Sequence, residues 1–269
     1  ERLDVLYQKI KAGIDFTPDV IAQTIEKYHS AIITFGFIYE MLPAVLNYAE
    51  ILTFYNNSTN EAMLIIDKAL TIKGLNSIDK ARIELLRADV LVSQDKIWDA
   101  ALIYAKIERA NTENPIGYDA KFRKVKMALY QQDFEWAKTQ IDVLKASTSK
   151  LISNDAIELS IFLYEGWSDS DSTQQPLKFF TSALLRHAQK KDEQAFLYID
   201  SLLATQHSFL SVEALNLKAK ILTEKHKFSE AAEVYELAIN QFSDETNTDR
   251  SLFQLGVLYF NYLNKSSTA

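Results

Sequence analysis

The sequence contains no cysteine, which excludes disulfide bonds and thiolate metal sites but leaves the cellular compartment open. Histidine is also scarce, with four in 269 residues, at His29, His187, His207 and His226. These histidines are not spaced four apart, so a helical zinc motif of the HExxH kind is not formed. We therefore expect neither a metal nor a cofactor.

Glycine and proline are equally scarce, with six and four residues. A β-sandwich or a doubly wound α/β fold needs more turn residues than this. Every glycine is isolated, so no glycine-rich phosphate loop is present. Because 48% of the residues are hydrophobic, the chain can form a large core, and the composition predicts helices joined by short polar turns.

An excess of positive charge is missing too: the formal net charge is −7 and the pI is near 5.2. This argues against general nucleic-acid binding, which depends on neutralising phosphates. The densest basic segment, Lys121–Lys126, is predicted to be a solvated helix face. The longest apolar run, Ala31–Tyr39, is too short to span a bilayer, so membrane insertion is not expected. Because the chain begins at Glu1, we expect an excerpt or a processed product, with any signal peptide upstream.

The most regular stretch, Ala81–Asn114, has the pattern of two amphipathic helices joined by the polar turn Ser93–Lys96. Small residues, Ala88 and Ala100, stand where two such helices would cross most closely. The same pattern returns along the chain with an alanine near the start of each second helix, at Ala62, Ala100, Ala137, Ala195 and Ala231. Successive alanines are 38, 37, 58 and 36 residues apart. A period of this size is typical of repeat architectures.

Two further positions follow each alanine on the same helical face. Four residues later comes a bulky residue, at Ile66, Tyr104, Ile141, Ile199 and Tyr235. Seven residues later comes an apolar residue, at Ala69, Ile107, Leu144, Leu202 and Ala238. Three residues before the alanine stands Thr59, Ile97, Phe134 or Phe228, whereas the fourth repeat has Asp192 there.

This pattern resembles the tetratricopeptide repeat (TPR), most closely at Lys227–Ala231 with Tyr235 and Ala238. Leu215, Ala219 and Leu222 stand at the matching offsets of the preceding helix; the proline that usually ends the second helix is absent. The resemblance implies an all-α, right-handed superhelical α-solenoid of stacked antiparallel helix pairs. The segment Phe134–Thr148 is similar to bacterial TPR proteins of the cell envelope, so we expect a bacterial protein and favour the envelope or periplasm over the cytoplasm.

We predict five segments: N-terminal helices packing on the array at 1–42, repeats at 43–150, an extra helix and polar loop at 151–175, repeats at 176–245 and a C-terminal capping helix at 246–269. Glu1–Gly13 is predicted to be a helix ended by Gly13. Thr17 and Pro18 are predicted to start the next one. Ser172 or Thr173 is predicted to cap the helix after the loop. The helix Asp249–Leu263 would cover the last pair.

The resemblance also supplies candidate binding residues, because the first helix of each pair lines the concave surface of a TPR array. Transferred by offset, these are Asn47, Tyr55, Arg82, Asp89, Phe122, Lys126, Tyr130, Asn216 and Lys220. Such a mixture suits an extended peptide, since amide and charged groups pair with backbone and carboxylates while rings pack on side chains. It does not reproduce the Lys/Asn/Arg clamp of chaperone-binding TPRs. The three tryptophans, Trp98, Trp136 and Trp167, lie near turns and are predicted to wedge between repeats.

The sequence therefore predicts a non-enzymatic scaffold that binds a partner protein or peptide on its concave face, with no catalytic residues. The match of Ser147-x-x-Lys150 to a serine hydrolase motif is interpreted as coincidence, because its companion motifs are absent. Two alternatives stay open: a sensing module whose superhelix changes curvature on binding a ligand or peptide, and an enzyme with a site inside the array. The oligomeric state stays open as well.

Overall fold

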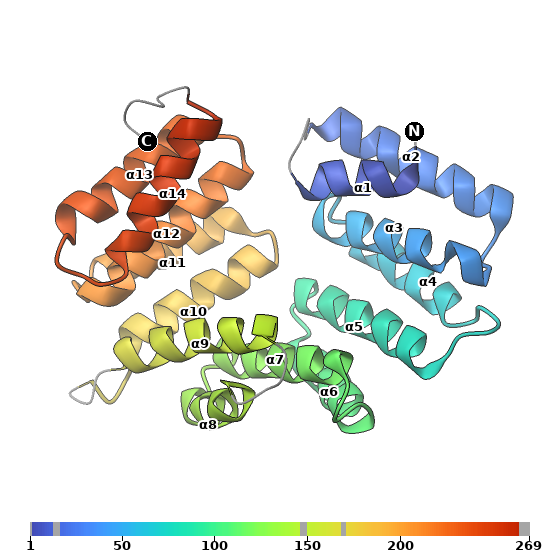
Figure 1. Ribbon diagram of the computed structural model, residues 1–269, viewed down its shortest axis with the longest axis horizontal. Coiled ribbons are helices and arrows are strands. Elements are labelled where there is room, and N and C mark those ends of the chain that lie inside the picture. Colours follow the sequence, from blue (N-terminus) through green and yellow to red (C-terminus); the bar gives the residue numbers. More distant parts are fainter. Residues whose placement is uncertain (1, 13–16, 146–149, 168–170, 264–269) are drawn as a thin grey trace. The chain divides into compact units, whose positions relative to one another are not determined.

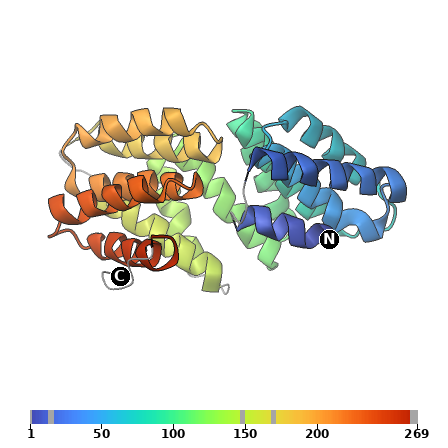
Figure 2. The same ribbon diagram turned by 90° about the horizontal axis from the view of Figure 1, so that it is seen from above.

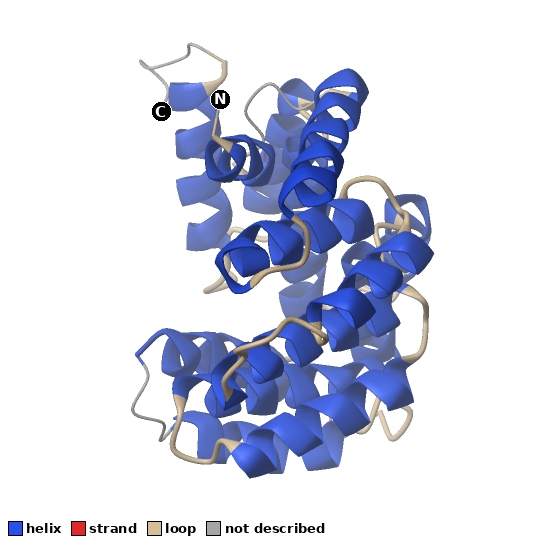
Figure 3. Cartoon of the chain, turned by 90° about the vertical axis from the view of Figure 1, so that its right-hand side faces the viewer, coloured by secondary structure: helices blue, strands red, loops and turns tan. Residues whose placement is uncertain are grey.

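The computed structural model describes residues 2–12, 17–145, 150–167 and 171–263, with the side chains of 150–153 and 155 left out. Within these ranges the chain forms helices and no strand (Figure 3). The helices are α1 (Leu3–Lys11), α2 (Pro18–Phe35), η1 (Tyr39–Met41), α3 (Leu42–Phe54), α4 (Thr59–Ala69), α5 (Ser77–Ser93), α6 (Ile97–Ala110), α7 (Pro115–Tyr130), α8 (Phe134–Lys145), α9 (Lys150–Glu165), α10 (Gln175–Ala188), α11 (Asp192–Leu203), α12 (Ser208–Glu224), α13 (Phe228–Gln241) and α14 (Thr248–Asn261). In the described part, no helix is long and apolar enough to cross a membrane.

The chain divides into two compact units: Glu1–Met127 with Ala146–Ile152, and Ala128–Lys145 with Ser153–Ala269. In the first unit, α3 packs against α4 and α5 against α6, and α3 also contacts α5 (Figure 1). The helices α1 and α2 also contact each other and form a pair of the same kind. Both of them pack on α3, the first helix of the next pair, just as α3 and α4 both pack on α5. The ring of Tyr28 in α2 stacks on Tyr48 in α3, with centroids 6.0 Å apart.

In the second unit, α10 pairs with α11 and α12 with α13, and α14 packs on both members of the last pair (Figures 1 and 2). The extra helix α9 lies against α8, since Lys145 donates a hydrogen bond to Ser160 at 3.1 Å. It also lies against α10, where Phe162 meets Phe180 edge-on. The predicted helix that starts at Pro18, the extra helix within 151–175 and the helix Asp249–Leu263 correspond to α2, α9 and α14, to within a few residues at their ends.

The repeat positions lie where the pattern predicts them. All five alanines that open the second helices have no exposed surface, as expected where two backbones cross closely. The bulky residues four positions later and the apolar residues seven positions later are all buried as well. The fold is therefore an all-α stack of antiparallel helix pairs within each unit, as the sequence predicts.

Each pair also shares a turn that the sequence analysis did not identify. Five residues before each alanine stands a residue in the left-handed region, with φ between 54° and 66°: Asn57, Asp95, Gln132, Lys190 and His226. In the last four of these turns, the next residue donates its N–H to the carbonyl five residues earlier, as Lys96 does to Leu91. This is the Schellman arrangement that ends helices, although glycine occupies none of the five positions.

Two predicted helix starts have different outcomes. Thr17 caps α2 as predicted, because its hydroxyl accepts a hydrogen bond from the Val20 N–H at 3.3 Å. The prediction of Ser172 or Thr173 as the cap of α10 is wrong: Gln174 is the N-cap residue, and the carboxylate of Asp171 accepts the N–H of Gln175 at 3.0 Å. The carboxylate of Asp171, one residue before Ser172 and two before Thr173, accepts a free N–H of the first turn in place of the expected hydroxyl. Gly13 and Ser147 lie outside the described residues.

Two surface predictions also need correction. The basic segment is not a purely solvated face, because Arg123 pairs with Asp89 and Asp119, and Lys124 pairs with Glu108. Trp98 does not wedge between repeats, since it is 76% exposed. Trp136 and Trp167 are half-buried, and the Lys138 ammonium lies 4.3 Å from the Trp167 ring centroid.

Candidate functional site

In the first unit, the predicted binding residues fall on the first helices of three successive repeats. Asn47 lies on α3 and Tyr55 follows it, Arg82 and Asp89 lie on α5, and Phe122 and Lys126 lie on α7. The helices α3 and α5 are in contact, and an ion pair joins α5 to α7. The structure thus brings these six residues onto neighbouring helices, and we call them the predicted row.

The α3 end of this row is bordered by the N-terminal pair. Asn47 is half-buried beside Tyr28, whose hydroxyl donates to the Leu3 carbonyl at 2.7 Å. Burial raises the pKa of Tyr28 to about 12, so Tyr28 stays a hydrogen-bond donor. The hydroxyl of Tyr7, from α1, bonds to Glu50, and burial together with that carboxylate raises the pKa of Tyr7. The helices α1 and α2 therefore extend the row by one repeat.

At the start of α5, Arg82 is exposed near the hydroxyl of Tyr39. That hydroxyl bonds to Asp79, which raises the pKa of Tyr39. Asp79 is itself held by a capping box, in which its N–H donates to Asn76 at 2.9 Å and its carboxylate accepts the Asn76 N–H at 3.3 Å. Arg82 therefore projects from a helix start whose geometry is fixed.

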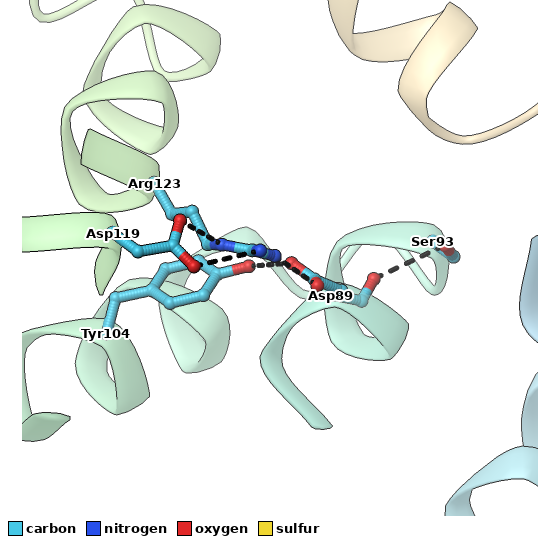
Figure 4. A network of polar contacts seen from close by, with 5 residues as sticks. All are labelled: Asp89, Ser93, Tyr104, Asp119 and Arg123. Atoms are coloured by element: carbon cyan, nitrogen blue, oxygen red, sulfur yellow. Dashed lines mark hydrogen bonds and ion pairs between the residues drawn. The ribbon is translucent and has the colours of Figure 1, made fainter. Parts of the chain in front are cut away.

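The centre of the row is a polar network that links three helices (Figure 4). The carboxylate of Asp89 in α5 accepts hydrogen bonds from the Tyr104 hydroxyl of α6, at 2.6 Å, and from Arg123 of α7. The same guanidinium donates to both oxygens of Asp119, at 2.9 and 3.2 Å. A forked guanidinium between two carboxylates fixes orientation as well as distance.

Burial and charge act together on the groups of this network. Burial and the Asp89 carboxylate raise the pKa of Tyr104, so its hydroxyl stays protonated and donates. Burial alone would lower the pKa of Arg123, but the two carboxylates outweigh it and the pKa is raised. With its donors held in place, the network stabilises the arrangement of α5, α6 and α7. Asp89 is therefore engaged within the chain and is not an open binding group.

In the second unit, the three predicted residues have different surroundings. Lys220 is exposed on α12 and Tyr130 is half-buried at the end of α7. Asn216 is only 8% exposed, and its amide oxygen accepts a hydrogen bond from Ser251 of α14 at 2.7 Å. Asn216 is thus covered by α14 and cannot line an open surface, a consequence of the helix that follows it along the stack.

No family model matches this sequence, and no curated protein sequence matches it. Among solved structures, it is similar to a tetratricopeptide repeat protein from Parabacteroides merdae, at 16% identity and a TM-score of 0.43, over 95% of this chain and 99% of the other. What the chain itself shows is antiparallel pairs of helices that cross at fully buried alanines and stack first helix on first helix. The fold is TPR-like.

Three residues of the polar network around Asp89 are not among the candidate residues predicted from the sequence: Tyr104, Asp119 and Arg123. Tyr104 was recognised only as a core position, and Arg123 only as part of a basic segment. The i, i+4 spacing of Asp119 and Arg123 is a recognisable signal, but their partner Asp89 lies 34 residues from Arg123. Among the described residues, the structure shows no group of three or more His, Asp or Glu side chains that could hold a metal.

A separate polar cleft lies in the second unit, with a volume of about 480 Å³. It is lined by the turn before α8 and the start of α10, including Gln132, Phe134, Trp167, Thr173 and Lys178. Both nearby helix N-termini are already capped within the chain, by Asp133 and Asp171. The cleft therefore offers few unpaired backbone donors to an anion.

Proposed function

We propose that this protein is a non-enzymatic interaction scaffold that binds an extended segment of a partner protein on the first-helix face of the first unit. One observation carries this proposal: Arg82 lies on α5 and Phe122 and Lys126 lie on α7. The ion pair between Asp89 and Arg123 holds these two helices together. A surface that is fixed before binding loses less conformational freedom when a partner docks.

The chemistry of this face favours a peptide with acidic and apolar side chains. Arg82 is exposed and Lys126 is half-buried, and both can pair with carboxylates or backbone carbonyls. Phe122, half-buried one turn before Lys126, supplies an aromatic surface for an apolar side chain. Aromatic and arginine side chains commonly carry most of the binding energy at interfaces.

Selection from a random peptide display library with the intact chain tests this proposal. The selected peptides are then measured against the triple variant Arg82→Ala, Phe122→Ala and Lys126→Ala. A matched control is Leu102→Ala, Lys106→Ala and Arg109→Ala on α6, which removes one large apolar and two cationic side chains in the same way. We expect binding to be lost in the first variant and kept in the control.

Equal binding by both triple variants would remove this face as the site. The sensing alternative remains a prediction, and X-ray scattering with and without a selected peptide tests it. An unchanged scattering profile at saturation argues against a change of curvature.

A further inference from the structure

The last described helix, α14, is apolar on two sides. On one side Ser251, Leu255, Leu258 and Tyr259 are buried where α14 packs on α12 and α13. On the other side Leu252, Phe253 and Phe260 are 58%, 67% and 68% exposed, and Gly256 lies between them in sequence. At 3.6 residues per turn these four positions form one stripe along the helix. A contiguous exposed apolar stripe on a helix whose opposite side is already buried marks an interaction surface.

Comparison with α12 shows that this stripe corresponds to the side on which a first helix packs against its second helix. The C-cap residues of α12 and α14 are Lys225 and Tyr262, 37 residues apart, which lies within the 36–38 residues that separate the regular repeats. The same offset places Gly256 on Ala219 and Leu252 on Leu215. In α12, Ala219 and Leu215 are 0% and 1% exposed, because the second helix α13 covers them.

Two other first helices have the same arrangement. Ala88 in α5 and Ala183 in α10 stand six residues before their C-cap residues, as Gly256 does in α14, and both are fully buried. Each of these helices pairs with a second helix, α6 or α11. The helix α14 is therefore a first helix whose crossing position for a second helix is open.

The two described residues that follow α14, Tyr262 and Leu263, do not fill this position. The ring of Tyr262 stacks on Phe228 at the start of α13, with centroids 4.2 Å apart and planes 12° from parallel. Leu263 packs against the same core cluster of α12, α13 and α14. Tyr262 and Leu263 thus lie on the covered side of α14 and leave the stripe open.

We propose that the stripe Leu252, Phe253, Gly256 and Phe260 binds an amphipathic helix of a partner protein, antiparallel to α14. The pattern that fits is that of this chain's own second helices: an alanine at the crossing, a bulky apolar residue four positions later and a small or apolar residue seven positions later. The glycine lets the partner's alanine approach closely, as Ala219 does for Ala231, and both of those are fully buried. This proposal extends the scaffold function to a second surface, whose residues are all distinct from Arg82, Phe122 and Lys126, so either proposal can fail without the other.

A labelled synthetic peptide with the sequence of α13, residues 227–241, is the probe, since it carries this pattern at Ala231, Tyr235 and Ala238. Fluorescence anisotropy with the intact chain measures its binding. We expect saturable binding that Leu252→Glu weakens at least about tenfold, because a charge replaces a buried apolar contact. Leu197→Glu on α11, which is 67% exposed, is the matched control and leaves the affinity unchanged.

A second peptide, with Ala231→Leu, tests the close crossing and should bind at least about tenfold more weakly, because its larger side chain prevents close approach. Circular dichroism and thermal melting verify that the Leu252→Glu variant is folded. No saturable binding, or equal binding by the Leu252→Glu chain, would overturn the proposal. So would a concentration-dependent dimer in sedimentation velocity that Leu252→Glu abolishes, since a second copy would then cover the stripe.

Discussion

Arg123 on α7 pairs with Asp89 on α5, two residues that lie 34 positions apart in the sequence. Side chains at this separation belong to successive repeats, so the pair fixes one repeat against the next. The hydroxyl of Tyr104 shares the same carboxylate from α6. A single carboxylate thus holds parts of three helices.

We expect Arg123→Gln to lower the free energy of unfolding by about 2 kcal/mol. Breaking a fully buried pair costs more, but the side chains of Arg123 and Asp89 remain 32% and 23% exposed, so water compensates in part. Urea denaturation followed by circular dichroism measures the change. Arg109→Gln on the exposed side of α6 is the control and should stay within about 0.5 kcal/mol of wild type. The effect of Arg123→Gln should also shrink in an Asp89→Asn background; equal effects in both backgrounds would mean that the two residues are not coupled.

The left-handed turn residues give a stabilising prediction. Lys190 has φ 58°, a conformation that a side chain disfavours and glycine adopts freely. Lys190→Gly should therefore raise the free energy of unfolding by about 0.5–1 kcal/mol, less the small contribution of its exposed pair with Glu224. Lys220→Gly, inside α12, is the matched control and should lower stability by about 1 kcal/mol. Thermal melting of the two variants should show shifts of opposite sign.

The sequence could predict the helix pairs because pairing depends on local patterns. An alanine with apolar residues four and seven positions later defines one helical face, and Ala100, Tyr104 and Ile107 are buried together for that reason. Contacts between repeats have no such local pattern. The burial of Asn216 depends on Ser251, 35 residues away, and the role of Arg123 depends on Asp89. Local patterns therefore predict which helices are present, whereas the burial of Asn216 and the pairing of Asp89 depend on contacts between repeats.

Gly117 provides a test of close packing at the start of α7. A Cβ atom at this position would lie 1.8 Å from the carbonyl oxygen of Asn111, which is backbone and cannot rotate away. Gly117→Ala should therefore displace α7 from the end of α6 and destabilise the first unit by about 3 kcal/mol. Lys121→Ala, one turn later in α7, should change stability by less than about 0.5 kcal/mol. A melting temperature for Gly117→Ala equal to that of wild type would contradict this packing.

Asp192 should make stability depend on pH. It stands where three of the other repeats have an apolar residue. Its carboxylate lies 3.0 Å from Nδ1 of His187 and 3.3 Å from Nζ of Lys225. Burial would raise the pKa of Asp192, but these two partners outweigh burial and the pKa is lowered. Because the pKa of Asp192 is lower in the folded chain, its stabilisation is fully present above the pKa of the unfolded chain, about 3.9. The stabilisation is lost as the pH falls through the lower pKa of the folded chain. We therefore expect Asp192→Asn to be less stable than wild type by about 1 kcal/mol at pH 6, with the difference starting to shrink below about pH 4 as the pH falls toward the lowered pKa of Asp192. Urea denaturation from pH 3 to pH 7 measures it, and Asp200→Asn, on the exposed side of α11, should show a smaller difference throughout.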